Sequence, residues 1–129
     1  MYGVTFKDGV LPIGHLAKAG VRLLGALDAT ARRLHVNLIV TCADKEHDAM
    51  DPHALGEAFD VRTQGFSDDR KRTILRETLV ELADAGNPMD QPESVGGGIG
   101  TIHFWGWIEH PNQSNEHLHI QRRKGTVYA

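Results

Sequence analysis

The chain has 129 residues, of which 40% are hydrophobic and 24% charged, and its formal net charge is −3. This length suits one domain with a buried core, so we expect a single domain over residues 1–129. The weak negative charge excludes the broad basic surface that non-specific nucleic-acid binding needs, and no apolar run reaches the roughly 18 residues of a membrane span. We therefore expect a monomer with neither nucleic-acid nor membrane partners.

The hydrophobic pattern predicts a mixture of helices and strands. Leucines and alanines recur at helical spacing in two segments, whereas β-branched or alternating residues mark four others. The predicted elements are helices at 13–34 and 67–86, and strands at 36–41, 56–62, 101–109 and 116–123. For residues 2–12 we expect an irregular lead-in that has room for one short strand, and for residues 87–100, which are rich in Pro, Asp and Gly, we expect a mobile loop. The fold class that follows is α+β, with a small, mainly antiparallel sheet that carries a metal site and helices that cover its other face.

Eight histidines in the chain are the unusual feature of its composition. His53 precedes Asp60 by seven residues, and strand alternation turns Asp60 to the same side as Ala58. Later in the chain, His117 and His119 are two residues apart, so one strand face carries both imidazoles about 7 Å apart. Catalytic zinc commonly takes three nitrogen or oxygen ligands, and His53, Asp60 and one histidine of the later strand make such a set.

Each of these residues also has a plainer interpretation. Taken alone, His53 is typical of a surface histidine, and Asp60 is typical of half a salt bridge. Trp105 and Trp107 share one strand face, where they either pack in the core or form a groove wall that positions a peptide or glycan. The joint pattern favours a metal site, and Glu116 is the nearest carboxylate that could serve it as general base.

The spacing H-x-x-G-x-A-x-D followed by E-x-x-H resembles a known family. It is similar to the zinc D-Ala-D-Ala carboxypeptidases and the L-alanyl-D-glutamate endopeptidases of phage lysis, which share the Hedgehog/D,D-peptidase fold. The matching residues are His53, Gly56, Ala58 and Asp60, followed by Glu116 and His119. The resemblance covers residues 36–121. It implies that Zn²⁺ is held by His53, Asp60 and His119, that Glu116 is the general base and later the acid, and that His117 assists the oxyanion.

Three departures from the family pattern stand out. Asp51 occupies the position of the usual serine, and could orient His53. Lys45 stands where the family has an arginine that polarises the substrate carbonyl, so it offers a point charge without the guanidinium fork. Strict alternation also places Glu116 and His119 on opposite faces, so their shared role requires a loop or bulge at Glu116.

The resemblance implies a zinc metallopeptidase that hydrolyses an amide bond of peptidoglycan stem peptides, as a phage or prophage lysis enzyme or as a D,D-carboxypeptidase. With no signal peptide visible, we expect synthesis in the cytoplasm and action in the cell wall or periplasm after release. Two alternatives stay open. One is a zinc-stabilised binding module of a virion or toxin-associated protein, which the lysine at position 45 favours, and the other is an amidase for a different small peptide.

Overall fold

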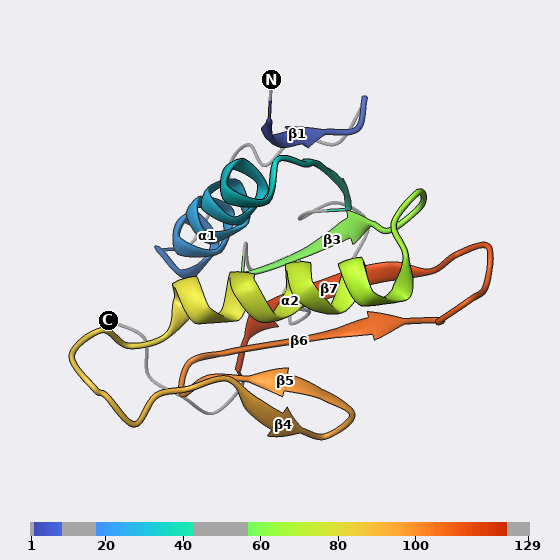
Figure 1. Cartoon of the computed structure of the whole chain (residues 1–129). Coiled ribbons are helices and arrows are strands. Elements are labelled where there is room, and N and C mark those ends of the chain that lie inside the picture. Colours follow the sequence, from blue (N-terminus) through green and yellow to red (C-terminus); the bar gives the residue numbers. More distant parts are fainter. Residues whose placement is uncertain (1, 9–17, 43–56, 124–129) are drawn as a thin grey trace.

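The computed structural model describes residues 2–8, 18–42 and 57–123 of the chain (Figure 1). In this part of the chain the fold is α+β, with a seven-stranded, mostly antiparallel sheet and two helices. The elements are β1 (Gly3–Phe6), α1 (Lys18–Leu34), β2 (Asn37–Cys42), β3 (Ala58–Arg62), α2 (Asp68–Leu82), β4 (Glu93–Val95), β5 (Gly98–Gly100), β6 (Phe104–Glu109) and β7 (His117–Arg122). The expected class is therefore found, but the sheet is larger than the small one predicted.

The strand order across the sheet is β1-β2-β3-β7-β6-β5-β4. Only β1 and β2 run parallel among the described strands, and every other neighbouring pair is antiparallel. The first three strands in sequence thus form one side of the sheet, and the last four form the other. They meet where β3 pairs with β7, which brings the Asp60 segment beside the segment that carries His117 and His119.

One hydrophobic core joins both helices to one face of the sheet. Leu23 and Leu27 of α1 and Leu79 of α2 share a buried cluster with Phe59 of β3 and Ile120 of β7. Figure 1 shows α2 crossing in front of β6 and β7, with α1 to its left beside the other half of the sheet. Because strand side chains alternate, the residues between the core positions of β3 and β7 turn to the opposite face.

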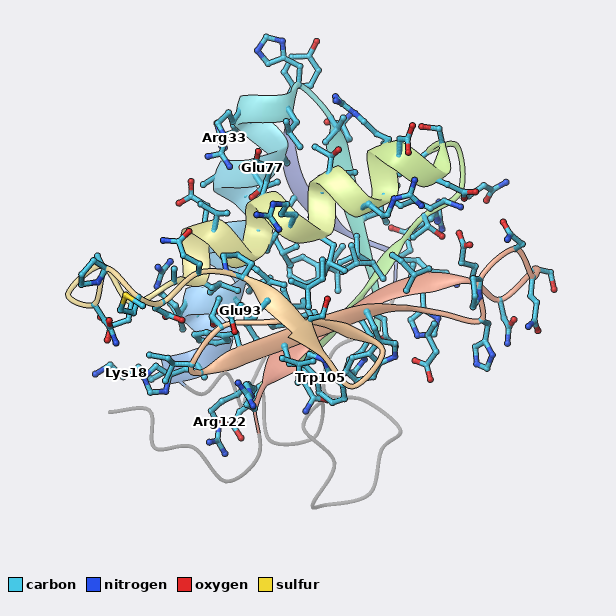
Figure 2. The ribbon with its side chains drawn as sticks, turned by 60° about the horizontal axis from the view of Figure 1, so that its bottom comes forward. Lys18, Arg33, Glu77, Glu93, Trp105 and Arg122 are labelled. Carbon is cyan, nitrogen blue, oxygen red and sulfur yellow. The ribbon has the colours of Figure 1, made fainter. Side chains whose placement is uncertain are left out.

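A serine side chain caps the start of α2. The Ser67 side chain accepts a hydrogen bond from the Arg70 N–H at 3.2 Å, and Asp68 and Asp69 occupy the first turn, where the helix dipole favours negative charge. The helix ends at Leu82, before the predicted end at Gly86, because Ala83 adopts an extended backbone conformation. Farther along, α2 is joined to α1 by the ion pair of Arg33 with Glu77, at 3.3 Å between Nη2 and Oε2 (Figure 2).

The segment 87–100 is not the loop that its composition predicted. It contains β4 and β5, which form a hairpin in which Val95 pairs with Gly98. Gly96 and Gly97 form the two-residue turn, with φ of 46° and 85°. A tight hairpin turn of this kind needs positive φ at both central residues, which glycine adopts without steric strain. The glycines therefore specify a turn rather than mobility.

Neither described helix combines the length and the apolar character that crossing a membrane requires.

Candidate metal centre

A row of three side chains crosses the face of the sheet opposite the core. Asp60 of β3 is in register with His119 of β7, and His119 is in register with Trp107 of β6. His119 Nδ1 lies 2.8 Å from Asp60 Oδ1, and the Trp107 ring lies against the His119 imidazole with ring centroids 4.2 Å apart. The His119 side chain is only 7% exposed. The central pairing of β3 with β7 thus brings the buried His119 against the partly buried Asp60.

His117 completes the group from the same strand as His119. Its Nε2 lies 3.6 Å from Asp60 Oδ1 and 2.9 Å from Glu109 Oε2. Asp60, His117 and His119 each offer a ligand atom, and these atoms all lie within 4.8 Å of one another. The three residues therefore form a group that could hold a metal ion.

The hydrogen bonds around the two imidazoles suit a bound cation. His117 Nδ1 lies 3.0 Å from the Asn115 carbonyl oxygen, and His119 Nε2 lies 2.8 Å from Gln121 Oε1. Both oxygens are acceptors, so each of these nitrogens carries the N–H. In the neutral imidazoles the lone pairs then sit on His119 Nδ1, 2.8 Å from Asp60 Oδ1, and on His117 Nε2, which is 2.9 Å from Glu109 Oε2 and 3.6 Å from Asp60 Oδ1. Two lone pairs and a carboxylate oxygen that converge in this way repel one another unless protons or a metal ion lie between them.

Glu116 lies on the helix side of the sheet, away from this group. Its Oε1 contacts Lys71 Nζ at 2.6 Å and accepts from Thr63 Oγ1 at 2.5 Å, while Oε2 accepts from the Asn112 N–H at 2.8 Å. The Lys71 ammonium, followed by the Thr63 and Asn112 donors, lowers the pKa of Glu116 to about 2. Glu116 immediately precedes β7 and its side chain turns toward α2, whereas His119 faces Asp60 on the opposite side of the sheet, so the shared role of these two residues stays a prediction.

Of the other predicted site residues, some lie outside the described part of the chain and two lie within it. His53 and Lys45, with Asp51 and Gly56, lie outside the described residues. Trp105 and Trp107 are described.

The two tryptophans lie on the face of the sheet that carries Asp60, His117 and His119, which we call the metal face, and their ring centroids are 4.3 Å apart. They line a hollow of about 430 Å³ together with Val95, Gln121 and Arg123. The Trp105 Nε1–H donates to the Val95 carbonyl at 2.9 Å, which fixes the ring at the hairpin, and Figure 2 shows Trp105 on the side of the sheet away from α2. The hollow therefore adjoins the Asp–His row.

Sequence reasoning missed two polar residues beside the group, Glu109 and Gln121. Both occupy the strand positions that alternate onto the face of His117 and His119, and β6 pairs Glu109 directly with His117. Joining the two predicted strands through their short polar turn, and then following the alternation, could have found both residues.

No family model matches the sequence, and neither a curated protein nor a solved structure does so.

Proposed function

We propose that this protein is a zinc-dependent peptidase that hydrolyses an amide bond in peptidoglycan stem peptides. The observation that carries the proposal is the convergence of Asp60, His117 and His119 on one sheet face. This convergence agrees with the spacing of the family motif that the sequence resembles. By the same resemblance the three ligands would be His53, Asp60 and His119, with His117 beside the metal to assist the oxyanion, and His53 lies outside the described residues.

The donor set supports zinc as the metal. Two imidazole nitrogens and one carboxylate oxygen are ordinary zinc ligands, and a catalytic site keeps a position for the substrate. When bound, zinc supplies Lewis acidity toward a substrate carbonyl. The chain's own residues would orient the peptide, with Trp105 and Trp107 as a flat wall beside His119. Lys45 would meet the negative charge that develops on the carbonyl oxygen.

A zinc-stabilised binding module is the second candidate, and the position of Glu116 favours it. A general base needs access to the reacting group, whereas this carboxylate is held by Lys71 and Thr63 on the helix side. Glu109, 2.9 Å from His117, is a second carboxylate beside the group that contains Asp60. A binding module would keep the Asp–His group and need neither glutamate for turnover.

Digestion of purified peptidoglycan tests the proposal. Zinc-loaded protein should release peptide fragments, a chelator should stop the release, and the fragment masses should identify the bond. Asp60→Asn should reduce release by roughly 100-fold or more, because it removes a ligand and even supporting residues cost 10–100-fold. Asp69→Asn, at an exposed aspartate on α2, is the matched control and should cleave normally.

Three outcomes separate the two candidates. Chelator-sensitive release establishes the peptidase. One zinc per chain without release supports the binding module instead. Wild-type protein that takes up no zinc contradicts both candidates.

A further inference from the structure

Gln121 supports the metal group from two residues beyond His119 on β7. Its side chain is buried, with 7% of the residue exposed, and its register partners are Ala58 and Trp105. Gln121 Oε1 lies 2.8 Å from His119 Nε2, and the Gln121 amide nitrogen donates to the Arg122 carbonyl at 3.1 Å. Because the NH₂ group is committed to a carbonyl, the amide presents its oxygen to the imidazole.

This contact determines where the proton of His119 resides. An amide oxygen only accepts hydrogen bonds, so His119 Nε2 must carry the N–H. When a metal ion takes the place of a proton between Nδ1 and Asp60 Oδ1, which lie 2.8 Å apart, the one N–H that remains on the ring is the one on Nε2. With the opposite tautomer, a nitrogen lone pair would face the Gln121 oxygen and the N–H would occupy the position where a metal could bind.

Packing on the ring supports the same orientation. Trp107 lies against the His119 ring with an interplanar angle of 35°, so a turn of the imidazole about its long axis would have to displace the indole. Gln121 and Asp60 thus hold the two nitrogens at opposite ends of a ring that Trp107 keeps in place.

We propose that Gln121 is a positioning residue, which fixes the His119 tautomer that presents Nδ1 to a metal ion shared with Asp60. Hydrogen-bond acceptors behind metal-ligating histidines act in this way in many metal sites, by fixing the ring and its protonated nitrogen. The inference rests on the metal site of the proposed function but not on the peptidase reaction.

Two substitutions in the full chain separate the acceptor from the shape of the side chain. Gln121→Met has a similar length but no strong acceptor, and we expect its Zn²⁺ affinity, measured by competition with a chelator, to fall by roughly 10–100-fold. Gln121→Glu keeps an oxygen acceptor and should bind Zn²⁺ within about threefold of wild type or more tightly. Gln113→Met, at an exposed position in the turn before β7, is the control and should leave the affinity unchanged.

The tautomer itself gives a second readout. In ¹⁵N-labelled, zinc-loaded wild-type protein, long-range ¹H–¹⁵N correlations should show the His119 proton on Nε2 and a metal-shifted Nδ1. A proton on Nδ1 would overturn the inference, as would a Gln121→Met protein that binds Zn²⁺ as tightly as wild type. If Gln121→Met does not fold, the wild-type spectrum and the affinity of Gln121→Glu still decide.

The outcomes also distinguish this inference from the proposed reaction. Zinc binding that depends on Gln121, without peptidoglycan cleavage, would contradict the proposed peptidase reaction and support the role of Gln121. Equal affinity of wild type and Gln121→Met, with cleavage present, removes only the inference. A wild-type chain that binds no zinc removes both.

Discussion

Glu116 and His117 are neighbours in the chain, yet their side chains lie on opposite faces of the sheet. His117 contacts Glu109 and Asp60 on the metal face, whereas Glu116 contacts Lys71 and Thr63 on the helix face. The Glu116 carboxylate is therefore best described as a structural anchor that ties the start of β7 to α2. We therefore expect this carboxylate to contribute to the free energy of unfolding.

Glu116→Gln should destabilise the protein in a pH-dependent way. The folded pKa of Glu116, about 2, lies below the ordinary value of 4.5 because of the Lys71 ion pair and the Thr63 and Asn112 donors. The carboxylate therefore stabilises the fold above the ordinary pKa, and this stabilisation is lost as the pH falls toward 2. We expect Glu116→Gln to lower the unfolding free energy by about 1 kcal/mol at pH 7, as measured by urea denaturation. This difference from wild type should shrink as the pH falls from 5 to about 2.

Glu93→Gln is the matched control for this measurement. Glu93 is exposed on β4, and its substitution should give an unfolding free energy close to wild type at every pH in this range. A Glu116→Gln protein whose stability runs parallel to that of wild type from pH 7 to pH 2 would show that the ion pair does not contribute.

At the scale of the elements, the contact of α2 with β6 depends on a missing side chain. A Cβ atom on Gly106 would lie 2.7 Å from Leu75 Cδ1 and 2.9 Å from the His119 carbonyl oxygen. Since both distances are below normal contact, the helix can pack at this point only because the strand residue is glycine.

Two glycine substitutions should therefore change the unfolding free energy in opposite directions. Gly106→Ala should lower the unfolding free energy by about 1–3 kcal/mol through overpacking between β6 and α2. Gly25→Ala, inside α1 and with no atom within 4 Å of its new Cβ, should raise it by about 0.5–1 kcal/mol through helix propensity. Chemical denaturation measures both, and a neutral Gly106→Ala would contradict the tight packing of α2 on the strand.

Some of these elements could be recognised from the sequence alone, and others could not. Alternation around Phe59 and Val61 in β3, and around Leu118 and Ile120 in β7, correctly predicted two strands and the face that carries Asp60, His117 and His119. The β4–β5 hairpin was missed because three-residue strands are too short to show a period, so only its glycine turn could have indicated it.

Glu116 is the residue at which strand alternation and the family resemblance give different expectations. Alternation turns this residue away from His119, whereas the resemblance assigns both residues to one site. The described structure agrees with the alternation at this position.

In the whole molecule, the candidate metal group of Asp60, His117 and His119 lies at the junction of the two halves of the sheet. Asp60 comes from β3 on one side, and His117 and His119 come from β7 on the other. Asp60 and His119 are 59 residues apart along the chain. The unfolded chain does not hold these ligands together. A metal bound by all three therefore favours the folded state and links both sides of the sheet.

Zinc should accordingly raise the stability of the folded protein. At a free Zn²⁺ concentration 100 times the dissociation constant, linkage gives about 2.7 kcal/mol of added unfolding free energy, provided that the unfolded chain binds no zinc. Thermal unfolding with Zn²⁺ and with a chelator should show this difference, and Asp60→Asn should remove most of it by deleting one ligand. Asp69→Asn, exposed on α2, should keep the whole increment. An Asp60→Asn protein that gains as much stability from zinc as wild type would place the metal elsewhere in the chain, and would separate the Asp–His row from any metal-dependent activity.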